Sequence, residues 1–184
     1  MTPKWPRLAA PRMRLWVADL VTASRLVVAL VFLVGRPAPT TAVLLVVWAW
    51  VSDALDGAMA RSVGGQGRLG NADHVVDAAV GVGLIWYLGE VGFVAALPTR
   101  VGAAVLLVLW AVTRVFAVQM LLLTLSYGGF LWWAATVAAP VRWLLPGTAL
   151  LLLVIEWRRF STELVPGFLH GWRHLAMSWR QRVG

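Results

Sequence analysis

Two pairs of aspartates stand close together in an otherwise apolar part of the chain. Asp53 and Asp56 are three residues apart, and Asp73 and Asp77 are four residues apart. Residues with these separations lie on one face of an α-helix, so each pair can present two carboxylates in the same direction. Four carboxylates at one place repel one another unless protons or a divalent cation neutralise them. The spacing therefore predicts either a metal site or a structural or proton-carrying carboxylate cluster.

The donor atoms favour a hard metal ion. Carboxylate oxygens suit magnesium, manganese or calcium. The chain has no cysteine, and His74 is the one histidine near the aspartates in the sequence, so zinc is not expected. Magnesium and manganese typically join a few carboxylates to a substrate phosphate. Gly57 and Ala60 follow on the same helical face, where their small size leaves room for a ligand.

Two arginines are predicted at a similar depth, Arg25 in the first membrane span and Arg114 in the fourth. A charged residue near the centre of a membrane helix costs on the order of 3 kcal/mol, so it calls for a partner. Arginine binds phosphate in a bidentate manner, so each arginine is either a phosphate ligand or an ion-pair partner of the aspartates. Asp19 and Thr22 lie on or near the helical face of Arg25 as supporting residues, although Asp19 could equally cap the first helix.

The composition requires that these residues be positioned by helices in a lipid bilayer. Of the 184 residues, 60% are hydrophobic and 13% are charged, whereas a soluble domain has about 25% charged residues. The mean hydropathy is +0.78. Because a span needs about 20 mostly apolar residues, the sequence predicts an all-α, six-span bundle in a single domain, residues 1–184. The spans are expected at 16–34, 41–60 and 73–88, with three more in 101–157 between breaks at 127–129, 140–142 and 146–147.

The positive charges predict the orientation of these spans. With both termini inside, the cytoplasmic segments hold most of the basic residues, and the outer turns hold only Arg36, Arg100 and Arg142. This asymmetry follows the positive-inside rule and predicts that both termini and the aspartates lie on the cytoplasmic side of the inner membrane. The net charge of +8 is thereby assigned to topology and anionic lipids, and no nucleic-acid partner is expected.

The two ends of the chain are predicted to lie at the membrane surface. Residues 1–15 form a basic juxtamembrane segment without the pattern of a signal peptide, so the first apolar stretch is expected to be a mature span. Residues 158–184 form a basic, tryptophan-rich interfacial tail. Within this tail, residues 164–183 mix apolar and basic side chains as an amphipathic interfacial helix does.

The aspartate spacing resembles the signature of the CDP-alcohol phosphatidyltransferases. The matching pattern is Asp53-x2-Asp56-Gly57-x2-Ala60-Arg61, then eight residues to Gly70, then Asp73-x3-Asp77. The run Asp19-x2-Thr22-x2-Arg25 is similar to the pattern of the family's first span, with Asp where Asn is common. The resemblance implies a homodimeric six-span enzyme that transfers the phosphatidyl group of CDP-diacylglycerol to an alcohol acceptor and releases CMP.

The resemblance also implies the role of each residue. Two Mg2+ or Mn2+ ions would be held by Asp53, Asp56 and Asp73 with help from Asp77, and Asp77 would be the general base. The nucleotide site would be lined by Gly57, Ala60, Arg61 and Gly70. The candidate ligands of substrate phosphate are Arg25, Arg68 and Arg114. Glycerol 3-phosphate is the favoured acceptor, since bacterial members of this size commonly use it; inositol phosphate, serine and another lipid alcohol stay open.

One spacing departs from the family pattern. Only Asn71 and Ala72 separate Gly70 from Asp73, where the family usually has three residues. If the start of the helix is otherwise fixed, a shift of one residue rotates the pair Asp73 and Asp77 by about 100°. The glycine-rich stretch at 64–67 could absorb this shift.

Other functions stay open at this point. An intramembrane prenyltransferase also pairs aspartate motifs with magnesium and diphosphate, but such proteins usually carry the motifs in separate halves of a longer chain. Here the aspartates fall within 25 residues, from Asp53 to Asp77. A transporter or non-catalytic cation-binding protein would place its carboxylates near the bilayer midplane, beside broken helices. A partner subunit that keeps the site without turnover is a further alternative.

Overall fold

The computed structural model describes residues 11–63 and 73–173, and the regular elements in these ranges are all helices. The all-α prediction is therefore confirmed for the described part of the chain. The six longer helices are α1 (Pro11–Val34), α2 (Pro39–Val63), α3 (Asp73–Glu90), α4 (Ala96–Thr113), α5 (Phe116–Val137) and α6 (Leu144–Ile155). The short elements are η2 (Ala139–Val141), α7 (Trp157–Arg159) and the π-helical η3 (Phe160–Leu164).

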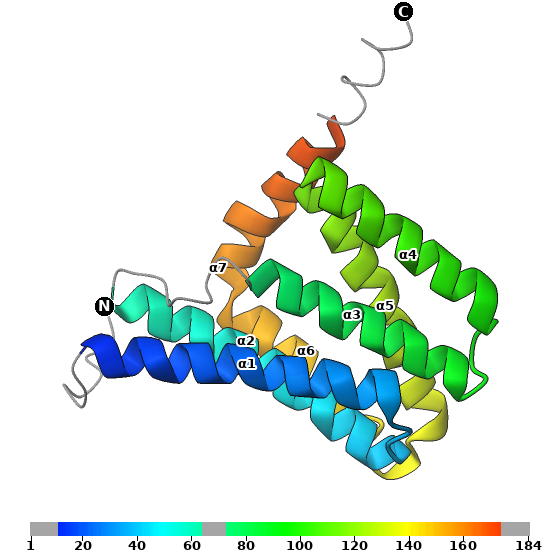
Figure 1. Ribbon diagram of the computed structural model, residues 1–184. Helices are drawn as coiled ribbons and strands as arrows, with labels where there is room; N and C mark the ends of the chain where they lie inside the picture. Colours follow the sequence, from blue (N-terminus) through cyan, green and yellow to red (C-terminus); the bar gives the residue numbers. More distant parts are fainter. Residues whose placement is uncertain (1–10, 64–72, 174–184) are drawn as a thin grey trace, which may run out of the picture.

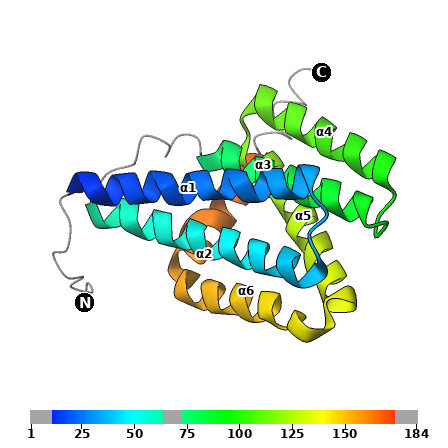
Figure 2. The same ribbon diagram turned by 60° about the horizontal axis from the view of Figure 1, so that its bottom comes forward.

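The helix α1 lies against both α2 and α3 (Figure 1). The other face of α3 packs against α4 and α5, and α6 runs along α2 (Figure 2). Gly83 allows the close approach of α1 and α3, because a Cβ atom there would lie 3.0 Å from the carbonyl oxygen of Ala29 and 3.2 Å from Cβ of Phe32. This contact brings the polar face of α1 within reach of the first turns of α3.

An aromatic cluster holds α1, α3 and α5 together, away from the aspartates. The ring centroids of Phe32 and Tyr87 are 5.3 Å apart, and those of Tyr87 and Trp133 are 5.2 Å apart in an edge-to-face arrangement. All these rings are buried, as is Phe130 between them. The Tyr87 hydroxyl donates to the carbonyl oxygen of Pro37 at 3.0 Å, so its burial leaves no polar group unsatisfied.

An ion cluster lies at the same end of α3 as the aromatic cluster. The carboxylate of Glu90, the last residue of α3, accepts hydrogen bonds from Arg36 and Arg100. The guanidinium of Arg100 also lies 3.8 Å from the centre of the Trp86 ring. These contacts connect the α1–α2 turn to the start of α4. They also place two of the predicted outer arginines together, at the opposite end of α3 from Asp73.

The expected breaks in the second half of the chain are only partly correct. The break at 140–142 is confirmed by η2, but the break at 127–129 is wrong because Tyr127 and its two following glycines lie inside α5. A helical glycine costs only about 1 kcal/mol, which burial of an apolar helix easily offsets. The break at 146–147 is also wrong. Pro146 falls in the first turn of α6, where a helix tolerates the missing N–H group.

The number of apolar helices differs from six. Among the described residues, three segments are long and apolar enough to cross a membrane, namely Pro39–Met59, Ala96–Thr113 and Phe116–Val137. A fourth exists if Ala139–Ile155 and Trp157–Arg173, which meet at an angle of 74°, form one broken span. The structure therefore supports a membrane protein with three or four clearly apolar spans.

The chain beyond α6 returns towards the start of α5 (Figure 1). A Cβ atom on Gly171 would lie 2.9 Å from Cβ of Ala117, and one on Gly167 would lie 3.6 Å from the Phe116 ring. The predicted tail at 158–184 is thus helical and packed on the bundle as far as Arg173. Its remaining residues lie outside the described part of the chain, as do residues 1–10 and 64–72.

Candidate active site

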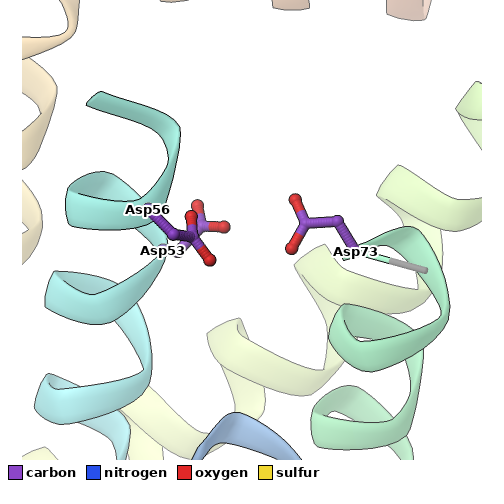
Figure 3. Close-up of side chains that lie close together, drawn as sticks. All are labelled: Asp53, Asp56 and Asp73. Carbon is purple, nitrogen blue, oxygen red and sulfur yellow. The ribbon is translucent and has the colours of Figure 1, made fainter. Parts of the chain in front are cut away.

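The two aspartate pairs meet between α2 and α3. Asp53 and Asp56 on α2 point towards Asp73, the first residue of α3 (Figure 3). One carboxylate oxygen from each of these three residues lies within 4.8 Å of the others. The prediction that the pairs share one end of neighbouring helices is therefore confirmed.

The guanidinium of Arg25 connects all four aspartates. Its Nη1 atom donates to Oδ1 of Asp53 and to Oδ1 of Asp77, each at 2.7 Å. Its Nη2 atom donates to Oδ2 of Asp56 at 2.6 Å and also to Oδ1 of Asp73. Only 1% of the Arg25 side chain is exposed. The predicted ion pairing of Arg25 is confirmed, and its contact with substrate phosphate stays a prediction.

Thr22 supports this cluster from the preceding turn of α1. Its buried hydroxyl donates to Oδ2 of Asp56 at 2.8 Å, the same oxygen that accepts Nη2 of Arg25. Asp19 lies one turn earlier, within α1. Because α1 begins at Pro11, Asp19 is not the N-cap of this helix, and that alternative is wrong.

The charge and exposure of the cluster fit a hard divalent cation. Four carboxylates face one guanidinium, which leaves a formal excess of three negative charges when all four are ionised. The Asp56 side chain is 8% exposed, whereas those of Asp53 and Asp73 are 45% and 34% exposed. One side of the cluster is thus closed by α1, and the other side is open to a ligand. Carboxylate oxygens at this separation can coordinate Mg2+ or Mn2+.

The shortened spacing before Asp73 does not turn its helix away from the site. Asp73 and Asp77 both contact the guanidinium of Arg25, so the pair faces the site despite the shortened spacing. The first turn of α3 is also held from α5, where the buried Gln119 donates from Nε2 to the carbonyl oxygen of His74 at 3.1 Å. Sequence analysis missed Gln119, although a glutamine inside an apolar span is a detectable signal.

Several predicted site residues do not join the described cluster. Arg114 lies in the α4–α5 turn rather than in a span, with a φ of 54° and its guanidinium 5.5 Å from the centre of the Trp110 ring. Its predicted place inside the fourth span is therefore wrong, and its contact with substrate phosphate stays a prediction. Gly57 follows Asp56 on α2 and is partly exposed. The side chains of the remaining predicted residues lie outside the described part of the structure: Ala60, Arg61, Arg68 and Gly70.

Arg159 is a second residue that sequence analysis missed. It is the last residue of α7, just after the bend that follows α6. Its own ion pairs are loose, at 3.8 Å from Glu156 and 3.7 Å from Glu163. The basic pair at 158–159 could have indicated this residue, but its charge was attributed to topology and lipid attraction.

Tyr127 joins α5 to α2. Its ring packs on Trp50 of α2 with 5.5 Å between centroids. The helical position of Tyr127 was not predicted, because the two glycines that follow it are typical of a turn.

Comparison with known proteins agrees with this geometry. The sequence model of the family named CDP-alcohol phosphatidyltransferase matches residues 15–179. The match spans all four aspartates and all the described helices except the first residues of α1. Comparisons with curated proteins and with solved structures gave no match. The chain therefore belongs to the CDP-alcohol phosphatidyltransferases, membrane enzymes of phospholipid biosynthesis that transfer a phosphatidyl group from a CDP-alcohol to an acceptor.

Proposed function

We propose that this protein transfers the phosphatidyl group of CDP-diacylglycerol to glycerol 3-phosphate and releases CMP, as a phosphatidylglycerophosphate synthase does. The observation that carries the proposal is the convergence of Asp53, Asp56, Asp73 and Asp77 on one buried guanidinium in a chain of this family. The prenyltransferase and transport alternatives lose support, because neither accounts for a family match over residues 15–179.

The carboxylates are the proposed metal ligands. Asp53, Asp56 and Asp73, with help from Asp77, would hold two Mg2+ or Mn2+ ions. Bound divalent ions would neutralise the diphosphate of the donor and stabilise the departing CMP. The cytidine nucleotide would lie beside the end of α2, against Gly57, Ala60, Arg61 and Gly70.

Asp77 is the proposed general base. The hydroxyl oxygen of the acceptor attacks the phosphorus that carries diacylglycerol, and the bond from that phosphorus to the bridging oxygen breaks. CMP leaves with the bonding electrons, and the hydroxyl proton passes to the Asp77 carboxylate. Arg25 orients this carboxylate through a hydrogen bond of 2.7 Å. With 24% of its side chain exposed, Asp77 can approach an acceptor.

The acceptor's own phosphate needs a cation beside the carboxylates. Arg25, Arg68 and Arg114 were the candidates from sequence. Among the described arginines outside the central cluster, we favour Arg159, because its existing ion pairs with Glu156 and Glu163 are long. A phosphate could replace these weak, half-exposed pairs at little cost.

A six-span topology is compatible with the helix lengths. The 24 residues of α1 would extend about 36 Å and the 18 residues of α3 about 27 Å, close to the ~30 Å of a bilayer core. The acidic residues of α3 lie in its first two turns and at its last residue. We propose that α1 and α3 span the membrane beside the apolar helices. The site and both termini would face the cytoplasm at the inner membrane, and the protein would be a homodimer.

The test is CMP release by the purified protein in liposomes that contain CDP-diacylglycerol. Mg2+ or Mn2+ is supplied with glycerol 3-phosphate, inositol phosphate or serine as separate acceptors. We expect release with glycerol 3-phosphate that is lost in Asp56→Asn and Asp77→Asn. Glu90→Gln, which removes a carboxylate at the far end of α3, should retain it. If CMP is released only with a different acceptor, that alcohol replaces glycerol 3-phosphate as the proposed substrate. If no acceptor supports CMP release, the proposed transferase activity is refuted.

A further inference from the structure

The hydrogen bonds of Arg25 leave one of its donors unused. A guanidinium has five N–H groups, and the two Nη atoms of Arg25 use theirs on the four aspartates. The Nε atom is buried and has no hydrogen-bond partner among the described residues. Buried donors are normally paired, so this N–H group remains available to one further acceptor.

Arg25 also stands where divalent cations would bind. Oxygens of Asp53, Asp56 and Asp73 lie within 4.8 Å of one another and could hold a metal ion. All three carboxylates are already paired with this arginine. A metal ion there would compete for the same carboxylates and would be repelled by the guanidinium. With 1% of its side chain exposed, Arg25 is poorly screened from that repulsion.

We infer that Arg25 is a built-in counter-cation that weakens metal binding until the donor diphosphate arrives and supplies new acceptors for its N–H groups. Phosphate oxygens match the guanidinium fork and can take the unused Nε–H. Metal and donor would then bind cooperatively, each strengthening the other by the same factor. The inference rests on the proposed function, because it assumes that the aspartates hold the metals. In this role Arg25 couples the binding of the metal to the binding of the donor and takes no part in the bond changes of the reaction.

The experiment measures Mn2+ binding to the purified protein by the electron paramagnetic resonance signal of free Mn2+, first without any nucleotide. We expect Arg25→Gln to bind Mn2+ about tenfold more tightly than the wild type, which corresponds to about 1.4 kcal/mol. Arg36→Gln is the matched control, since it removes an arginine from Glu90 at the other end of the bundle, and it should bind Mn2+ like the wild type.

The second arm adds CDP-diacylglycerol. The donor diphosphate contacts the metal in every variant, so donor should tighten Mn2+ binding to both proteins, but by about tenfold more in the wild type than in Arg25→Gln. Mn2+ affinity in Arg25→Gln that equals or falls below that of the wild type without donor would overturn the inference.

Arg25→Gln leaves four carboxylates without a cation, so its folding is followed by thermal unfolding with and without Mn2+. If it does not fold, Arg25→Lys is used in its place. One ammonium cannot bridge four carboxylates, so Mn2+ should still bind to this variant more tightly than to the wild type. Equal or weaker binding by this folded variant would overturn the inference. If neither the wild type nor any variant binds Mn2+, the metal site of the proposed function fails as well. Unchanged Mn2+ binding across the arginine variants refutes the role of Arg25 alone.

Discussion

Replacing Thr22 with valine would test whether α1 organises the aspartates for metal binding. The Thr22 hydroxyl donates to Oδ2 of Asp56 at 2.8 Å, and Arg25 donates to the same oxygen at 2.6 Å. Thr22 is 5% exposed and Asp56 is 7% exposed, so water has little access to replace the lost donor. Valine has a similar shape without the hydroxyl, so the substitution removes one hydrogen bond and leaves the packing nearly intact.

The size of the effect follows from two independent estimates. A hydrogen bond to a charged group contributes about 1.5–3 kcal/mol. Loss of a group that orients a metal ligand typically lowers metal affinity or activity by about 10–100-fold, which corresponds to about 1.4–2.7 kcal/mol. We therefore expect Thr22→Val to raise the Mg2+ concentration for half-maximal activity by about 10–100-fold.

The assay is CMP release measured over a series of Mg2+ concentrations. Thr22→Ser keeps the hydroxyl and should stay close to the wild type. Ser24→Ala is the matched control on the same helix, because the Ser24 hydroxyl donates to the carbonyl oxygen of Val21 and accepts from Trp48, away from the aspartates. A Thr22→Val enzyme with the same Mg2+ dependence as Ser24→Ala would refute the reasoning.

Two further predictions concern charged residues outside the aspartate cluster. Arg159→Gln should raise the KM for glycerol 3-phosphate more than it lowers kcat, because it removes the cation proposed to bind the acceptor phosphate; a kcat effect at unchanged KM would contradict this role. Hydrogen bonds from Arg100 and Arg36 hold the pKa of Glu90 below its ordinary value of 4.5. The ionised carboxylate therefore stabilises the folded protein above pH 4.5. This stabilisation is lost as the pH falls through the lowered pKa of the folded state. The Tm of the wild type should therefore exceed that of Glu90→Gln at neutral pH and approach it in acid, whereas a constant difference would contradict the ion cluster.

The aspartate site was predictable because helical geometry fixes it locally. The separations of three and four residues place Asp53 with Asp56, and Asp73 with Asp77, before any tertiary contact is known. Neighbouring helices joined by a short connection must run antiparallel, so the two pairs meet. Arg25 could be placed near the site by its depth in the first span. That its guanidinium contacts all four carboxylates depends on the close packing of α1 and α3 and was beyond sequence reasoning.

The misplaced features all depend on long-range contacts or on small boundary shifts. The two glycines after Tyr127 predict a turn, yet the apolar surroundings keep α5 continuous through them. The position of Arg159 depends on the bend of 74° after α6, and no local pattern encodes that angle. Arg114 differs from its prediction because α4 ends one residue before it. Glu90 and Arg36 are 54 residues apart in the sequence, so their pairing required the fold.

The most direct test of the central claim measures both products of the proposed reaction together. The wild-type protein is incubated with CDP-diacylglycerol liposomes, glycerol 3-phosphate and Mg2+, and CMP and phosphatidylglycerol phosphate are quantified by mass spectrometry. We predict equal amounts of the two products, with neither formed in Asp77→Asn or after chelation of the metal. CMP release that needs no acceptor, or a phosphatidyl product that forms without the Asp77 carboxylate, would contradict the account.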